Sequence, residues 1–347
     1  MNFKKKILKI FFYNILFILI ILLIYEFLFG NWFTNKNFGN LFLPLNKSLI
    51  VNKLPYETND PVIYTTDSNG FRNNKHDLKS IEILVIGGST TEEKIIDDNK
   101  IWTRILEINT NKKVLNAGIG GQTSFGHVKM FDIWFSRFKD LKPNYTLFYI
   151  GINDALFMIE NITLKNYDNF IDKRVMNSID RDSLVHVNKI DRIHQYIKNN
   201  SALIQLFKFI KGNLIAYKYK INYNLDFTIS NKDISKKKFI LSDKDKKKIT
   251  IYKKFYIDNL YKLLEKTRNI NSQPIFITQS ISSKHWLNEF LIEINNYTKN
   301  FCLEKKLKCI YLADDLNLND TDFYDGIHTN PTGSEKIGVF LSNYFNN

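Results

Sequence analysis

The chain has 347 residues, 44% of them hydrophobic and 24% charged, and this composition excludes an intrinsically disordered protein. Its formal net charge of +14 favours anionic partners such as phospholipid headgroups, acidic polysaccharides or nucleic acid. No helix-turn-helix, zinc-finger or aromatic ribonucleoprotein signature accompanies that charge, so we do not expect nucleic-acid binding. The length suits one large domain or two small ones.

The first thirty residues predict a transmembrane anchor. The stretch from Ile7 to Phe29 is almost wholly apolar, and about twenty helical residues span the hydrocarbon core of a bilayer. Lysines at positions 4, 5, 6 and 9 predict a cytoplasmic N-terminus and an exported remainder. A cleaved signal peptide is the alternative, but the apolar stretch is long for one and no small-x-small cleavage site follows it. We therefore expect residues 1–30 to form an uncleaved anchor, with the rest on the periplasmic or cell-surface side.

Residues 31–80 are predicted to form a connector with some structure of its own, including a turn at the sequence DSNGFR, residues 67–72. From residue 81, short apolar runs alternate with helical periodicity. We predict strands over 81–86, 113–116, 145–150, 274–278 and 308–312, and helices over 99–107, 122–138, 249–268 and 286–304, with a last helix after Pro331. Residues 158–248 are polar and show no buried strand pattern, so we predict an insertion there, a candidate lid.

Strands that alternate with helices predict an α/β fold, with a central parallel sheet of about five strands and helices on both faces. In such sheets, ligands bind outside the carboxyl ends of the strands. Ser89, Gly121 and Asn153 each follow a predicted strand, so this topology gathers the three residues at one edge of the sheet.

Ser89 is a candidate nucleophile. It stands in the sequence GGSTT, residues 87–91, directly after a predicted strand. A serine at a tight strand-to-helix turn exposes its hydroxyl and its backbone N–H at the start of a helix. The sequence matches only half of the G-x-S-x-G pattern of α/β-hydrolases, and a helix N-cap is the alternative role, a common one for serine.

His328 is a candidate general base for Ser89, with Asp325 as the carboxylate that orients its imidazole. The two residues are three positions apart on a predicted loop before the last helix, so both can face one point. Alone, the D-x-x-H spacing is a weak signal, because histidine at a helix entrance is often a surface or capping residue. Its position after the last predicted strand favours the catalytic interpretation.

Three donors are candidates for an oxyanion hole: the backbone N–H of Ser89, the backbone N–H of Gly121 and the side-chain amide of Asn153. A glycine-rich phosphate loop is the alternative at 118–121, but Thr123 stands where the G-x-G-x-x-G pattern needs its third glycine. For Asn153 the alternative is a turn-forming Asn-Asp pair. We assign Asp154 to that structural role.

Together these segments resemble the four blocks of the SGNH (GDSL-type) hydrolase superfamily, which carry Ser, Gly, Asn and a D-x-x-H pair. The resemblance implies that Ser89 is the nucleophile and an oxyanion donor, that Gly121 and Asn153 are further donors, and that Asp325 and His328 complete a triad.

The same resemblance implies a three-layer α/β/α, flavodoxin-like domain over residues 81–347, apart from the insertion. One departure is Gly88, where the motif that names the family has aspartate. The NGFR sequence at 69–72 also resembles membrane-anchored bacterial members of the superfamily.

The resemblance and the predicted export imply a membrane-anchored serine esterase that removes acyl groups, most simply acetyl, from cell-envelope carbohydrate. An O-acyltransferase that passes the acyl group to a sugar hydroxyl would use the same site. A lysophospholipase or thioesterase is a further alternative, which the polar insertion disfavours. A non-catalytic glycan-binding module would be expected to lack a site residue, and all five are present.

The other histidines show no metal-ligand spacing, and we predict neither a metal nor a cofactor. They stand at positions 76, 127, 186, 194 and 285, of which His186 and His194 fall in the insertion as lid or surface residues. Cys302 and Cys309 either form a disulfide, as exported proteins allow, or stay as two small core residues. The oligomeric state is left open.

Overall fold

The computed structural model describes residues 3–30, 61–159 and 243–346. Between these ranges it describes only residues 32, 43, 46–51, 54–58, 197, 200–204, 206, 207 and 210. The chain divides into two compact units. One contains residues 1–40 and 181–223, and the other contains residues 41–180 and 224–347.

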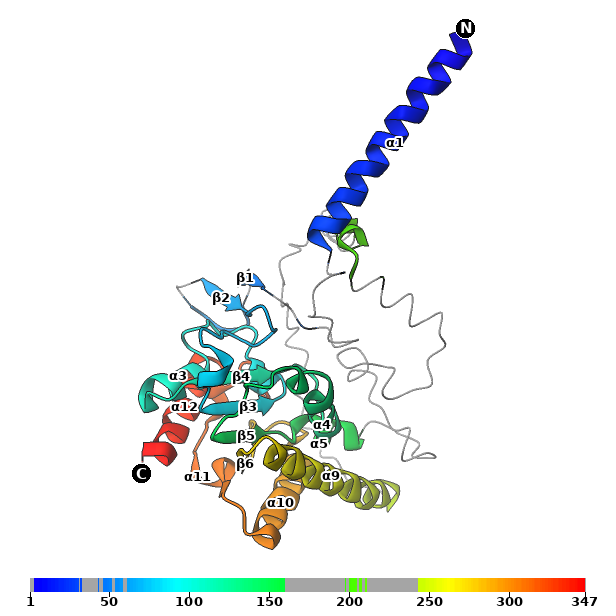
Figure 1. Ribbon diagram of the computed structural model, residues 1–347. Helices are drawn as coiled ribbons and strands as arrows, with labels where there is room; N and C mark the ends of the chain where they lie inside the picture. Colours follow the sequence, from blue (N-terminus) through cyan, green and yellow to red (C-terminus); the bar gives the residue numbers. More distant parts are fainter. Residues whose placement is uncertain are drawn as a thin grey trace. The chain divides into compact units, whose positions relative to one another are not determined.

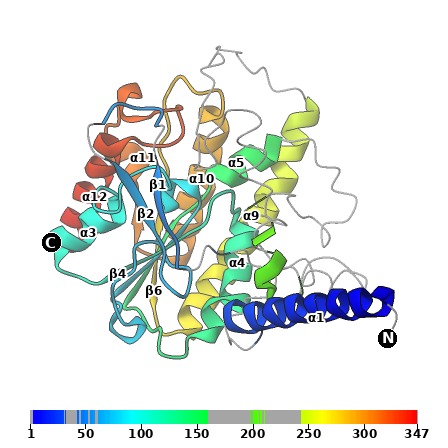
Figure 2. The ribbon, with the colours of Figure 1, turned by 90° about the horizontal axis from the view of Figure 1, so that it is seen from above.

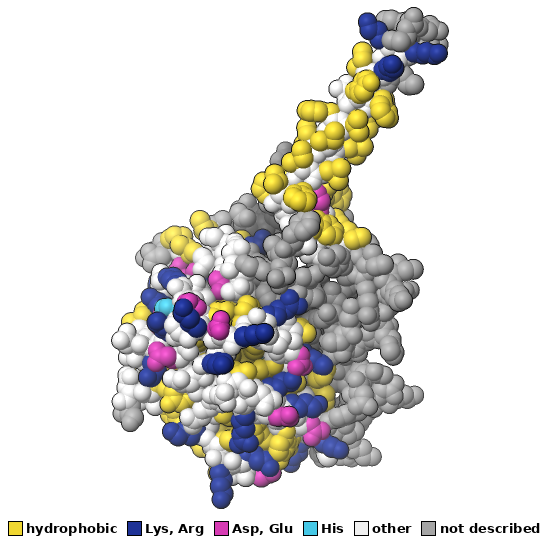
Figure 3. Space-filling model, viewed as in Figure 1, with side chains coloured by type: hydrophobic (Ala, Val, Ile, Leu, Met, Phe, Trp, Pro, Cys, Tyr) yellow, Lys and Arg dark blue, Asp and Glu magenta, His cyan; other side chains and the backbone are white. Residues whose placement is uncertain are grey.

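The first unit contains the helix α1 (Phe3–Phe29). Its stretch Lys9–Phe29 is long and apolar enough to cross a membrane, and none of it is buried against protein. Figure 3 shows apolar side chains along this helix and lysines at its N-terminal end. The length and apolar character match the predicted anchor, although a signal sequence meets the same two criteria.

Glu26 interrupts the apolar surface of α1 and binds a cluster of donors within the first unit. Its carboxylate accepts hydrogen bonds from Trp32 Nε1 at 2.6 Å and from Ser201 Oγ at 3.1 Å. The backbone N–H groups of Ala202 and Leu203 donate to the same carboxylate, at 3.2 and 2.8 Å. Residues 202–204 are helical, so Glu26 satisfies N–H groups that the first turn of a helix leaves without partners.

Replacement of Glu26 with alanine is expected to release residues 201–204 from the end of α1. The N–H groups of Ala202 and Leu203 would then lose their acceptor, so their amide hydrogens should exchange with solvent faster. Hydrogen exchange of the detergent-solubilised chain measures this effect. Glu26→Gln keeps one acceptor oxygen and should show an intermediate rate, and equal rates in all three proteins would contradict the assignment.

The second unit contains a parallel sheet of five strands, as predicted from the sequence. The strands are β3 (Ile83–Gly87), β4 (Val114–Gly118), β5 (Tyr145–Tyr149), β6 (Gln273–Ile277) and β7 (Cys309–Ile310), in the spatial order β4-β3-β5-β6-β7. This is the flavodoxin-like order, in which the first strand lies between the second and the third. Gly87 is in register with both Gly118 and Tyr149, so β3, β4 and β5 end at the same edge.

Helices cover both faces of the sheet and complete the three predicted layers (Figures 1 and 2). One face carries α3 (Trp102–Thr110) and α12 (Pro331–Asn346), and the other carries α4 (Ser124–Ile133), α5 (Ile152–Ile159), α9 (Asp243–Asn269) and α10 (Asn288–Lys305). Trp102 and Leu341 belong to a buried cluster with Val85 of the sheet. On the opposite face, the rings of Phe276 and Phe301 lie 5.5 Å apart. The strands are mostly apolar because both of their faces are buried, and Asn116 of β4 and Thr146 of β5 are buried polar exceptions.

Two predicted elements are shorter in the structure. The helix predicted over 122–138 ends at Ile133, because the backbone departs from helical geometry at Trp134 and continues as a short 3₁₀ helix. There the Trp134 ring stacks on Phe71 with centroids 4.5 Å apart, and its Nε1 donates to Asn69 O at 2.9 Å. The strand predicted over 308–312 ends at residue 310, because Leu312 begins the helix α11 (Leu312–Asp315).

The connector predicted over 31–80 contains an antiparallel pair of strands, β1 (Ser48–Val51) and β2 (Val62–Thr65). Its residues from 41 onward belong to the same compact unit as the sheet. The insertion predicted over 158–248 lies almost wholly outside the described residues, and so does its proposed role as a lid. At its C-terminal end, α9 begins at Asp243, six residues earlier than predicted.

Cys302 and Cys309 form a disulfide, with their Cα atoms 6.2 Å apart. The bond joins α10 to β7. Of the two alternatives left open by the sequence, the structure selects the disulfide, which is the form expected outside the cytoplasm.

Candidate active site

Ser89 is the first residue of α2 (Ser89–Glu92), a short helix directly after β3. Gly88 occupies the N-cap position, so the Ser89 hydroxyl does not cap this helix. Instead, Ser89 Oγ lies 2.7 Å from Nε2 of His328, a residue 239 positions later in the chain. The backbone N–H of Ser89 belongs to the first helical turn, where no intrahelical acceptor exists.

Asp325 binds the other nitrogen of the same imidazole. Its Oδ2 lies 2.7 Å from His328 Nδ1. Its Oδ1 accepts the backbone N–H groups of Ile327 at 2.9 Å and of His328 at 2.7 Å. Burial opposes ionisation, but the hydrogen bonds and the His328 charge outweigh it, and the pKa of Asp325 falls below its ordinary value. Asp325 is therefore an ionised acceptor that fixes the imidazole with Nδ1 protonated and Nε2 facing Ser89.

The imidazole of His328 is also held from its face. The Tyr324 ring lies parallel to it, with an interplanar angle of 9° and centroids 5.6 Å apart. The Ser282 N–H donates to Gly326 O at 2.8 Å and ties the D-x-x-H loop to the segment after β6. These contacts limit the positions that the imidazole can adopt relative to Ser89.

Gly121 follows β4 and Asn153 follows β5 at the carboxyl edge of the sheet, where Ser89 follows β3. Gly121 has a φ of +79°, which favours glycine, and its N–H has no hydrogen-bond partner among the described residues. Asn153 Nδ2 donates to Gln122 O at 2.9 Å and would lie 2.5 Å from a Cβ atom on Gly88. Glycine at position 88 thus allows the Asn153 amide to approach the Ser89 turn.

Asp154 has a structural environment, as assigned from the sequence, but it lies in the first turn of α5 rather than in an isolated turn. It accepts the Ser124 N–H and hydroxyl, the latter at 2.6 Å, and the Tyr252 hydroxyl at 3.0 Å. Burial raises its pKa to about 6 despite these hydrogen bonds. Asp154 therefore joins α5 to the first turn of α4 and to α9.

Glu93 is a residue near the site that the sequence analysis did not single out. It is buried and accepts the Trp102 N–H at 2.8 Å, the Ser334 hydroxyl at 2.9 Å and the Thr329 hydroxyl at 3.1 Å. Thr329 follows His328, so Glu93 connects the Ser89 helix to the D-x-x-H loop. Burial outweighs the hydrogen bonds and raises the pKa of Glu93 to about 8. A glutamate pair at 92–93 normally indicates a solvated surface, and only the structure shows this burial.

The raised pKa of Glu93 predicts a loss of stability as the pH rises from about 5 to about 8. The folded state holds the Glu93 proton more tightly than the unfolded state, whose ordinary pKa is 4.5. The resulting stabilisation is complete below that value and is lost as pH rises through about 8. We expect the melting temperature to fall between about pH 5 and pH 8, and to fall less in Glu93→Gln, which carries no charge. Equal falls in both proteins would contradict this prediction.

Within the part of the chain that the structure describes, no three His, Cys, Asp or Glu side chains gather as a metal site. The remaining described histidines have separate environments. His127 is buried, and His76 Nε2 contacts Glu107 at 3.0 Å. His285 is packed beside Gly326, and burial lowers its pKa. His186 and His194 lie outside the described residues.

Comparison with solved structures finds several esterases and lipases of similar fold. A member of the lipolytic G-D-S-L family from Veillonella parvula is 14% identical, covers 77% of this chain and 98% of its own, and has a TM-score of 0.42. A GDSL-like lipase from Bacteroides thetaiotaomicron is 11% identical, with 79% and 91% coverage and a TM-score of 0.41. The acetyl xylan esterase AlAXEase is 12% identical, with 76% and 99% coverage and a TM-score of 0.41.

No protein-family model and no curated protein matches the chain. The chain is similar to SGNH (GDSL-type) hydrolases in its four sequence blocks and in its three-layer fold.

Proposed function

We propose that this chain is a serine ester hydrolase of the SGNH type, with Ser89 as its nucleophile. One observation carries the proposal: an unbroken series of hydrogen bonds runs from Ser89 Oγ through the His328 imidazole to the Asp325 carboxylate. At its Ser89 end, the backbone N–H of Gly121 and the amide of Asn153 lie at the same edge of the sheet. A hydroxyl, a base, an orienting carboxylate and N–H donors are the parts that acyl transfer needs.

The reaction begins when Ser89 Oγ attacks the carbonyl carbon of the ester and His328 Nε2 takes its proton. The negative oxygen of the tetrahedral intermediate accepts hydrogen bonds from the Ser89 N–H, the Gly121 N–H and Asn153 Nδ2. Asp325 stabilises the imidazolium that forms. The intermediate then expels the alcohol, which receives the proton from His328, and leaves an acyl group on Ser89. Water, deprotonated by His328, attacks this ester, and the carboxylic acid leaves as Ser89 recovers its proton.

We further propose that α1 anchors the enzyme in a membrane and that its substrate is an acyl ester, O-acetyl above all, of extracytoplasmic carbohydrate. Lysines before the apolar stretch favour export of the remainder. A pocket of about 520 Å³ is lined in part by Gln279, Ser280, Ile281 and Ser283, and the intervening Ser282 donates its N–H to the D-x-x-H loop. Its lining includes the side-chain amides of Asn288, Asn296 and Asn317. Amides bind sugar hydroxyls well, and the net charge of +14 suits an acidic glycan.

Initial rates of p-nitrophenyl acetate hydrolysis by the full chain in detergent test the nucleophile. We expect Ser89→Ala to reduce the rate to background, whereas Ser136→Ala, which removes an exposed serine hydroxyl in the short 3₁₀ helix after α4, should leave it unchanged. Equal rates in the wild type and Ser89→Ala would contradict the proposed function.

A second comparison tests the substrate class. The enzyme should release acetate from an acetylated polysaccharide and should hydrolyse p-nitrophenyl acetate faster than p-nitrophenyl palmitate. A preference for the long acyl chain would instead indicate a lipid ester as the substrate.

A further inference from the structure

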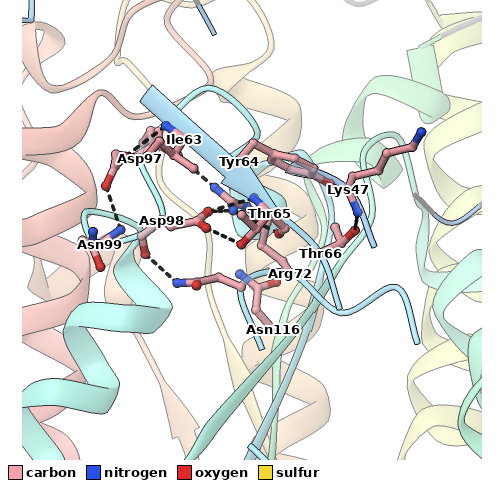
Figure 4. A network of polar contacts seen from close by, with 12 residues as sticks. Lys47, Ile63, Tyr64, Thr65, Thr66, Arg72, Asp97, Asp98, Asn99 and Asn116 are labelled. Atoms are coloured by element: carbon pink, nitrogen blue, oxygen red, sulfur yellow. Dashed lines mark hydrogen bonds and ion pairs between the residues drawn. The ribbon is translucent and has the colours of Figure 1, made fainter. Parts of the chain in front are cut away.

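The NGFR sequence at 69–72 contains a buried arginine, Arg72, which lies in a polar network with Thr65 and Asp98 (Figure 4). The Arg72 guanidinium donates to three backbone carbonyls: Glu92 O at 3.1 Å, Ile96 O at 2.9 Å and Thr65 O at 3.3 Å. It also pairs with the Asp98 carboxylate. Burial lowers the pKa of Arg72 to about 10, so the group remains charged at neutral pH. Arg72 thus binds the backbone at the end of α2, the helix of Ser89, and the backbone of the segment that follows it.

A series of side-chain contacts connects Arg72 and Tyr64 of the connector to the glycine-rich loop at 118–121. The Tyr64 ring lies under the Arg72 guanidinium, 4.3 Å from ring centroid to Cζ. The Tyr64 hydroxyl donates to Glu92 Oε1 at 3.0 Å. The other carboxylate oxygen, Glu92 Oε2, accepts the Gly120 N–H at 2.9 Å. Gly120 directly precedes Gly121, the candidate oxyanion donor. Two hydrogen bonds therefore connect Tyr64 to the glycine-rich loop at 118–121, which we call the oxyanion loop.

The backbone of Arg72 is also linked, through Asn116, to the Ser89 helix and to the end of β4. Its N–H donates to Asn116 O on the edge strand β4 at 3.0 Å. The Asn116 side chain in turn donates to Thr91 O at 2.7 Å and accepts the Gly118 N–H at 2.9 Å. The connector therefore contacts both the helix that carries Ser89 and the start of the loop that carries Gly121.

We propose that Glu92 is a positioning residue for the oxyanion donor Gly121, and that Arg72 and Tyr64 of the connector hold Glu92 in place. The inference rests on the proposed function of the site. Glycine peptides rotate easily, and an oxyanion donor is effective only when its N–H already points at the developing charge. The carboxylate fixes the peptide that precedes the Gly120–Gly121 pair and so restricts the orientation of the Gly121 N–H. The sequence 69–72 then has a catalytic consequence beyond forming a turn.

Glu92→Gln and Tyr64→Phe test this positioning role in the full chain. The first substitution leaves one carbonyl oxygen for two donors, and the second keeps the ring under Arg72 but removes the hydroxyl. We expect each variant to lower kcat by about tenfold with KM changed by less than about twofold, since loss of a whole oxyanion donor costs about 10²–10³. Glu82→Gln is the matched control, because Glu82 Oε2 accepts the Lys113 N–H at 3.0 Å, a bond remote from the oxyanion loop.

Binding of methylboronic acid separates positioning from a purely structural role. A boronate forms a tetrahedral adduct with the serine and places an oxygen in the oxyanion hole, so its inhibition constant should rise in proportion to the loss in kcat/KM. Wild-type kcat and boronate affinity in Tyr64→Phe would overturn the inference, whatever result Glu92→Gln gives. The inference would also be overturned if Glu92→Gln and Tyr64→Phe lost no more kcat than the control Glu82→Gln. Activity that survives Ser89→Ala would instead refute the proposed function.

Discussion

Replacement of Asp325 with asparagine is expected to lower kcat by about 10⁴-fold in a chain that remains folded. The asparagine oxygen can still accept the backbone N–H groups of Ile327 and His328, so the loop keeps its shape. Its NH₂ group then faces His328 Nδ1, where the carboxylate lay. The imidazole is forced to carry its proton on Nε2 and can no longer accept one from Ser89.

The measurement is kcat for p-nitrophenyl acetate, with the melting temperature recorded beside it. Asp132→Asn serves as the control, because Asp132 is an exposed carboxylate on α4 that pairs with Lys266. A loss of less than about tenfold in Asp325→Asn would show that Asp325 does not set the tautomer of the base.

Replacement of Gly88 with alanine is expected to lower kcat by about 10²–10³-fold. The backbone at Gly88 has a φ of −87°, which alanine adopts without strain. The new Cβ, however, would lie 2.5 Å from Asn153 Nδ2 and would push that amide away from Gln122 O and from the oxyanion hole. The effect should therefore equal the loss of one oxyanion donor.

A double-mutant cycle with Asn153→Ala checks this reasoning. Once the Asn153 amide is gone, the alanine at position 88 meets little else, and the double variant should be no slower than Asn153→Ala alone. Multiplied losses in the double variant would show that Gly88→Ala acts by another route, such as displacement of Ser89.

The sequence contained enough information to predict the sheet and to place the candidate site residues at its carboxyl edge. Continuous apolar runs predicted five buried strands, and their alternation with helices required parallel pairing. Ser89, Gly121 and Asn153 follow strands that end in register, so their approach is a consequence of topology. The bond between Ser89 and His328 spans 239 residues, and it was indicated by the D-x-x-H spacing together with its position after the last strand and the resemblance of the four blocks.

The supporting contacts could not be predicted in the same way. Glu92 and Glu93 are consecutive charged residues, and nothing in their spacing shows that one binds the Gly120 N–H and the other is buried against Thr329. The turn at 67–72 was recognisable, but the burial of Arg72 depends on residues far along the chain. Long-range packing of this kind leaves no local periodicity in the sequence. The domain boundary at residue 81 remains a prediction, while the described connector packs in the same unit as the sheet.

The central claim is that Ser89 is an activated nucleophile, and covalent labelling tests it most directly. The full chain in detergent would be treated with an alkyl fluorophosphonate, and its peptides would be examined by mass spectrometry. We predict a single phosphonyl adduct on Ser89, formed at least about 100-fold more slowly in His328→Ala, because an unassisted serine hydroxyl is a weak nucleophile. A wild-type chain that forms no adduct on Ser89, or forms it equally fast without His328, would contradict the account.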